Sequence, residues 1–118
     1  MAKVLLVDDA AFMRMRCAKV ITKMGHSVIE AENGAQAVES FDREQPDLVL
    51  LDITMPEMDG ITALKIIRQH APAAKVAMVS AMGQQDMVLE AIKSGAADFV
   101  LKPFDESRLV SAIEKLLG

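Results

Sequence analysis

The sequence predicts an α/β fold in which helices cover both faces of a parallel sheet. Five short apolar runs alternate strictly with five helical patterns along the 118 residues. Strands and helices in strict alternation form parallel strands joined by right-handed crossovers. The pattern runs without a linker, repeat or low-complexity segment, so we expect one domain that spans residues 1–118.

Two strands and two helices are predicted in the first part of the chain. Residues 4–7 are all apolar and form the first strand. Residues 12–24 place apolar side chains at the i, i+4, i+7 and i+8 spacing of a helix face, and Gly25 ends this pattern. The run at residues 27–30 is more polar and is expected at an edge of the sheet. Asn33 is a suitable N-cap for the second helix.

The most informative run is at residues 48–51, where four large apolar side chains follow one another. A half-exposed strand would alternate with polar residues, so this strand is expected to be covered on both faces. It delivers Asp52 to its carboxyl end, where open parallel sheets place ligands and chemistry. An isolated Asp could equally be a structural N-cap, so the other strand ends must decide its role. Residues 55–60 then turn the chain toward a third helix, which ends before Pro72.

The last part of the chain repeats the alternation twice more. Residues 75–79 form the fourth strand, and residues 84–94 form a helix that stops at Gly95. Residues 97–101 form the fifth strand. Asp105 then caps a final amphipathic helix.

Composition excludes several classes of protein. The net charge of −4 argues against electrostatic binding to nucleic acid or to an anionic membrane surface. No apolar run approaches the roughly 20 residues of a transmembrane helix, and the chain enters a strand directly, without a signal peptide. The single cysteine, Cys17, permits no internal disulfide and falls at an apolar helix position, where a core residue is expected. We therefore expect a cytoplasmic protein.

Four of the five strands end in a chemically useful residue: Asp8-Asp9, Asp52, Ser80 and Lys102. Because these groups collect at one end of the sheet, they suggest a site more strongly than any one of them alone. Three carboxylates in one crevice repel one another, so the site would retain a proton or bind a cation. Oxygen ligands without nearby His or Cys favour a hard cation, and so few carboxylates suit Mg²⁺. The alternative is that Asp8 and Asp9 only cap the first helix, but two adjacent acids are more than a cap needs.

The chain resembles the receiver domain of two-component response regulators, and especially its single-domain chemotaxis members. The resemblance covers the whole chain, and four motifs in order carry it. They are Val-Asp-Asp at residues 7–9, Leu-Asp-Ile-Thr-Met-Pro-Glu-Met-Asp-Gly at residues 51–60, Ser80-Ala81, and Lys-Pro-Phe at residues 102–104. The resemblance, and not the periodicity, supplies the strand order 2-1-3-4-5 of a flavodoxin-like sheet.

The resemblance also implies a role for each site residue. Asp52 would be the phosphoacceptor, attacking the phosphorus of a phosphohistidine on a partner kinase. Mg²⁺ would be held by Asp9 and Asp52 directly, by Asp8 through water, and by the backbone carbonyl of Thr54. Lys102 would contact the phosphoryl group.

The resemblance implies that four positions act in switching or in the lifetime of the phosphoryl group. The Ser80 hydroxyl would move onto the phosphoryl group, which would change the surface of the fourth helix, fifth strand and fifth helix for a partner. Phe99 matches an aromatic switch position that is often Tyr in the family. Without the phenolic hydroxyl, any switching here must use burial. Thr54 and Met82 would flank the mouth of the pocket and control how readily water reaches the phosphoryl group.

Three alternative functions can be weighed from the same residues. The short length and the segments 11–14 and 80–85 resemble chemotaxis regulators that bind the flagellar motor switch, with a stand-alone phosphorelay carrier as the main alternative. A monomer is expected. An aspartate-nucleophile phosphohydrolase would need a second acid two residues after Asp52, where this chain has Thr54. A flavin carrier would need a phosphate-binding loop where this chain has Asp8-Asp9. A signalling protein, and not a turnover enzyme, is expected.

Overall fold

A computed structural model describes residues 1–55, 57–81 and 85–118 of the chain. It contains a five-stranded sheet in which all neighbouring strands are parallel, in the order β2-β1-β3-β4-β5. The expected α/β class and strand order are therefore confirmed. The strands are β1 (Lys3–Val7), β2 (Ser27–Ala31), β3 (Leu48–Leu51), β4 (Val76–Ser80) and β5 (Asp98–Leu101).

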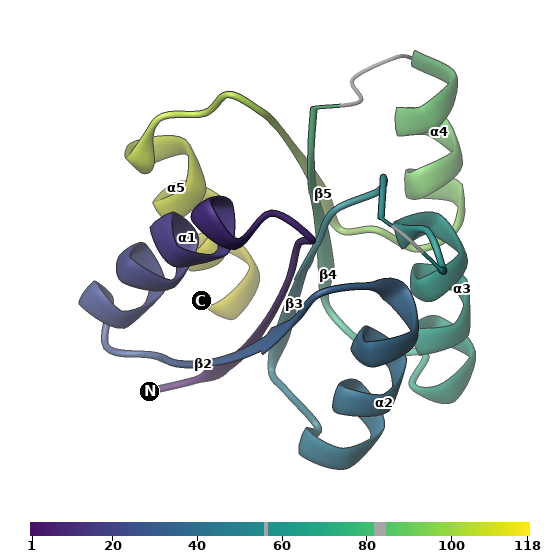
Figure 1. Ribbon diagram of the computed structural model, residues 1–118, viewed down its shortest axis with the longest axis horizontal. Helices are drawn as coiled ribbons and strands as arrows, with labels where there is room; N and C mark the ends of the chain where they lie inside the picture. The colour runs from purple at the N-terminus through teal and green to yellow at the C-terminus, as the bar shows by residue number, and fades with distance from the viewer. Residues whose placement is uncertain (56, 82–84) are drawn as a thin grey trace.

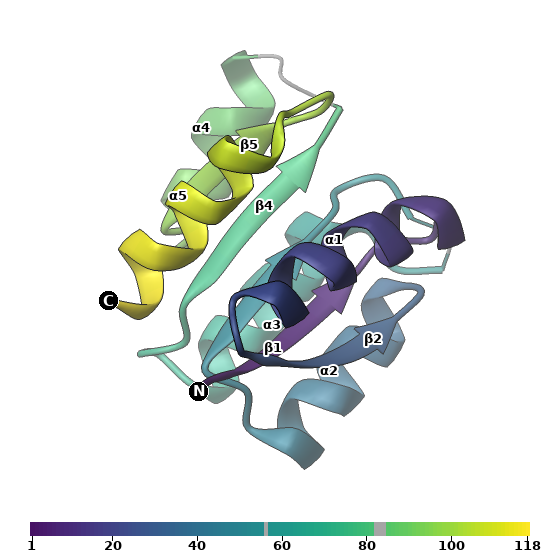
Figure 2. The same ribbon diagram turned by 90° about the vertical axis from the view of Figure 1, so that its left-hand side faces the viewer.

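Helices cover both faces of the sheet (Figure 1). Helices α1 and α5 lie on one face, and α2, α3 and α4 lie on the other. Figure 2 shows α1 and α5 in front of the strands after a quarter turn of the molecule. The helices are α1 (Ala11–Lys23), α2 (Gly34–Glu44), α3 (Gly60–His70), α4 (Gln85–Lys93) and α5 (Glu106–Leu117).

The sheet separates two hydrophobic cores, and alternate residues of each central strand enter different ones. In β3, Leu48 and Leu50 pack with the core beneath α1 and α5, whereas Val49 and Leu51 pack with the core beneath α2, α3 and α4. All four side chains are fully buried. This confirms the prediction that the apolar run is covered on both faces.

Cys17 lies in the core beneath α1 and α5, as expected. Burial raises the pKa of its thiol to about 11. A thiol with such a pKa stays protonated at neutral pH and behaves as a small apolar group.

The predicted edge strand and helix caps are also confirmed. Strand β2 lies at one edge, and its Val28 and Ile29 are only half-buried. Asn33 caps α2, because its Oδ1 accepts a hydrogen bond from Gln36 N at 2.8 Å. Asp105 caps α5 in the same way. Element boundaries differ from the predicted ones by one residue in several places, and residue 84 lies outside the described residues.

The loop after β3 is held tightly against the start of α3. Gly60 N donates a hydrogen bond to Ile53 O at 2.7 Å, and a Cβ at Gly60 would overlap the carbonyl oxygen of Asp52. Asp59 caps α3 by accepting from Thr62 N at 2.8 Å. Glycine is therefore required at position 60 so that the backbone carrying Asp52 can pack closely on the helix.

Candidate functional site

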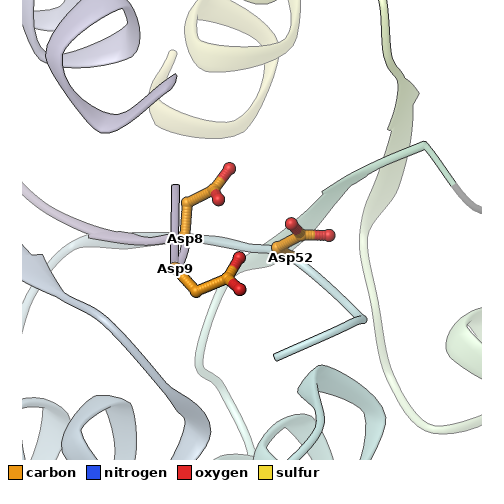
Figure 3. A group of neighbouring side chains, drawn as sticks. All are labelled: Asp8, Asp9 and Asp52. Carbon is orange, nitrogen blue, oxygen red and sulfur yellow. The ribbon is translucent and has the colours of Figure 1, made fainter. Parts of the chain in front are cut away.

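Strands β1 and β3 bring the acidic residues together at their carboxyl ends. Val7 and Leu51 are paired across the two strands, and Asp52 N donates to Val7 O at 3.1 Å. Asp8 and Asp52 therefore follow paired positions and leave the sheet side by side. Figure 3 shows the side chains of Asp8, Asp9 and Asp52 grouped at this edge.

The three carboxylates are close enough to share one cation. One oxygen from each of Asp8, Asp9 and Asp52 lies within 4.8 Å of the others. Asp8 and Asp52 are buried, whereas Asp9 is exposed. A donor set of carboxylate oxygens alone matches a hard divalent ion. The donor chemistry of the residues present therefore fits a metal site.

Lys102 bridges the two buried carboxylates. Its Nζ donates to Asp8 Oδ2 at 2.5 Å and to Asp52 Oδ2 at 3.1 Å. Burial by itself would lower the pKa of Lys102, but the hydrogen bond to Asp8 and the charges of Asp52 and Asp8 outweigh burial and raise the pKa above its ordinary value. The lysine therefore remains a cation at the centre of the acidic group.

Backbone hydrogen bonds fix the other oxygen of each buried carboxylate. Asp8 Oδ1 accepts from Ala10 N at 2.9 Å, and Asp52 Oδ1 accepts from Ile53 N at 2.7 Å. Ala10, and not Asp8 or Asp9, is the N-cap residue of α1, and its side chain makes no capping bond. Capping of the first helix therefore does not account for the pair of acids.

The other predicted residues that the structure describes, Ser80, Thr54 and Phe99, occupy different environments. Ser80 is buried at the end of β4, and its carbonyl accepts from Lys102 N at 2.8 Å, so it adjoins the lysine along the backbone. Thr54 is exposed and lines a groove with Met55 and Met87 of α4. Phe99 is half-buried and packs against the core beneath α2, α3 and α4. Met82 lies outside the described residues.

Arg14 also contacts the site, although no site role was predicted for it from the sequence. Its Nη1 donates to the backbone carbonyl of Asp8 at 2.6 Å, and it forms ion pairs with Glu30 and Glu32. Arg14 lies six residues after Asp8, in the first turn of α1, and belongs to the segment 11–14 that was singled out above only for its resemblance to chemotaxis regulators.

Within the described residues, no helix combines the length and apolar character that crossing a bilayer requires.

Comparison with known proteins gives consistent results for the sequence and the fold. The chain is 58% identical to the chemotaxis protein CheY of Bacillus subtilis (strain 168) over 117 residues, covering 98% of each chain. It is 56% identical to CheY of Thermotoga maritima, covering 97% of this chain and 96% of that one. A chain in the crystal structure of the CheX–CheY–BeF3–Mg²⁺ complex from Borrelia burgdorferi superposes with a TM-score of 0.94 at 34% identity, over 98% of this chain and 89% of that one.

A family model for the response regulator receiver domain matches residues 4–114. The matched segment contains all five strands and the acidic group at the ends of β1 and β3. The chain therefore belongs to the response regulator receiver domain family.

Proposed function

We propose that this chain is a two-component signalling phosphoacceptor, in which a histidine kinase transfers a phosphoryl group to Asp52. The observation that carries the proposal is the gathering of three carboxylates and one lysine at the ends of β1 and β3. Similarity to chemotaxis regulators over nearly their whole length supports a role in chemotaxis, in the cytoplasm. The chain is a signalling protein of its family and not a turnover enzyme.

Charge balance at the site supports a requirement for Mg²⁺. Three carboxylates and a single ammonium leave the group with an excess of negative charge, which would repel an incoming phosphoryl group. The residues that would hold the ion are Asp8, Asp9 and Asp52, with the backbone carbonyl of Thr54. When bound, Mg²⁺ would neutralise charge on the phosphoryl oxygens during transfer. The related Borrelia structure contains Mg²⁺ together with BeF3.

Each side chain at the strand ends has a distinct task in the transfer. An Asp52 oxygen forms a bond to phosphorus while the bond from phosphorus to the kinase histidine nitrogen breaks, and that nitrogen keeps the electron pair. Lys102, already 3.1 Å from Asp52 Oδ2, supplies a positive charge to the phosphoryl oxygens. The Ser80 hydroxyl donates a further hydrogen bond. Thr54 and Met82 limit the access of water to the product.

The surface that binds a downstream partner would lie on α4, β5 and α5, and Phe99 belongs to β5. Leu89, Ile92 and Leu101 expose large apolar side chains on α4 and β5. A partner protein, in chemotaxis the flagellar motor switch, would bury these side chains. Phosphorylation would change the affinity of this surface for the partner by pulling Ser80 inward and by altering the burial of Phe99.

The test is the mass of the intact protein after incubation with a small phosphodonor and Mg²⁺. Wild type is expected to gain one phosphoryl group, and Asp52→Asn none. Asp47→Asn is a matched control, because Asp47 immediately precedes β3 at the opposite end of the same strand. Equal labelling of wild type and Asp52→Asn, or labelling without Mg²⁺ at the same rate, would contradict the proposal.

A further inference from the structure

We propose that Arg14 is a positioning residue that orients the main chain of Asp8 and Asp9 for cation binding. The inference rests on the proposed function, because it concerns the same metal site. None of the hydrogen bonds that Arg14 makes with the described residues involves the carboxylate of Asp8, Asp9 or Asp52. Its Nη1 instead donates to the backbone carbonyl of Asp8 at 2.6 Å.

The backbone of Asp8 lies just beyond the end of β1, where the sheet no longer satisfies all of its polar groups. Its N–H donates to Ala31 O at 3.2 Å, which continues the pairing with β2. No backbone N–H of the described residues donates to the Asp8 carbonyl, which instead accepts a hydrogen bond from the guanidinium of Arg14. The planar peptide unit that follows Asp8 is therefore held by a side chain from α1.

This peptide unit also determines where Asp9 lies. Because the unit is planar, fixing the Asp8 carbonyl fixes the N–H and the Cα of Asp9 as well. Asp9 is exposed, and its carboxylate makes no hydrogen bond with the described residues. Of the three acids, Asp9 consequently depends most on its backbone for its position.

Arg14 is itself held in place from the side of β2. Its Nε lies 3.2 Å from Glu30 Oε1, and its Nη2 lies 3.4 Å from Glu32 Oε1. The Arg14 side chain is only 12% exposed, although both glutamates are more than half exposed. The planar fork of arginine can satisfy the carbonyl and both glutamates at once, which a lysine ammonium cannot do in the same geometry.

The sign of the effect on Mg²⁺ affinity separates positioning from simple electrostatics. Removing a positive charge near a cation site should by itself tighten Mg²⁺ binding. Loss of positioning should weaken it, and groups that orient metal ligands typically contribute about 10- to 100-fold in affinity. We therefore expect Arg14→Met to bind Mg²⁺ about tenfold more weakly than wild type. Arg16→Met, the same change at an exposed arginine of α1, is the control and should bind Mg²⁺ as tightly as wild type or more tightly.

Mg²⁺ affinity is measured by calorimetric titration, with thermal unfolding run in parallel to confirm that each variant is folded. Arg14→Lys is the second variant if Arg14→Met does not fold, and it should also lose affinity, because it retains the charge and not the fork. Unchanged or tighter Mg²⁺ binding by the folded Arg14 variant would overturn the inference, whatever its melting temperature.

A measurement without metal separates this inference from the proposed function. In metal-free protein, the amide NMR signal of Asp9 should shift and exchange faster in Arg14→Met, whereas that of Ile53 beside Asp52 should stay unchanged. An unaltered Asp9 amide would overturn the positioning role. Failure of wild type to bind Mg²⁺, with the Asp9 amide altered as expected, would instead count against the metal-dependent function.

Discussion

Lys102 is the residue on which the charge balance of the acidic site depends. Its ammonium bonds Asp8 and Asp52, and all three side chains are mostly buried. Removing one partner from such a group leaves the others as buried charges without a counter-charge. The free-energy cost of that removal is larger than the net stabilisation that the intact group provides. The lysine and a divalent cation compete to neutralise the same carboxylates.

This competition gives a prediction for Lys102→Met. In metal-free buffer, the variant should lose about 3 kcal/mol of unfolding free energy, because two buried carboxylates remain without a counter-charge. Added Mg²⁺ should restore more stability to Lys102→Met than it adds to wild type. Urea unfolding with and without Mg²⁺ measures both quantities. An equal Mg²⁺ response in the two proteins would show that the lysine and the cation do not share ligands.

Most residues of the acidic site could be identified from sequence because each follows an apolar strand. Asp8, Asp52 and Lys102 were predicted on that basis, and the structure brings them into hydrogen-bonding contact. Arg14 could not be identified in this way. Its contact with the Asp8 carbonyl depends on how α1 packs beside the end of β1, and periodicity does not report that orientation.

At the scale of elements, α5 is tied to β5 by an ion pair that lies beside the proposed switch residue. Arg108 of α5 bonds both carboxylate oxygens of Asp98 at 3.3–3.4 Å and the carbonyl of Phe99 at 3.1 Å. Burial alone would raise the pKa of Asp98, but the hydrogen bonds from Arg108 and from Phe99 N and the charge of Arg108 lower it below its ordinary value. The ionised form of Asp98 therefore stabilises the fold.

A pH dependence follows from the direction of this shift. A carboxyl group with a lowered folded-state pKa contributes stability above the unfolded-state pKa of about 4, and the contribution is lost as pH falls below it. Between about pH 5 and pH 2, wild type should therefore lose more stability than Asp98→Asn. The difference should not exceed about 1 kcal/mol, because Arg108 is partly exposed. Parallel acid titrations of the two proteins, with unfolding free energy as readout, test this prediction. An equal loss of stability in wild type and Asp98→Asn would contradict it.

At the scale of the whole molecule, stability depends on the two cores that the sheet separates. Leu50 enters the core beneath α1 and α5 with no exposed surface. Leu101, on edge strand β5, is 52% exposed. The same amino acid therefore occupies opposite environments in two strands of one sheet.

Leu50→Ala should destabilise the protein by about 3 kcal/mol, since it removes buried methyl groups and leaves a cavity. Leu101→Ala is the matched control and should change the unfolding free energy by no more than about 0.5 kcal/mol. Chemical denaturation of both variants tests the pair. Similar losses in the two would contradict the burial that distinguishes these strands.

Local sequence patterns were sufficient to predict the α/β class, the burial of residues 48–51 on both faces and the acids at the strand ends, because alternation and unbroken apolar runs are local properties of a chain. Which strand ends are neighbours depends instead on the packing of the strands in three dimensions. Only the pairing of β1 with β3, and the reach of Lys102 across the end of β4, place the carboxylates within 4.8 Å of one another and the ammonium between two of them. Such contacts join residues far apart in the chain, so they depend on packing of the whole domain and not on any local pattern.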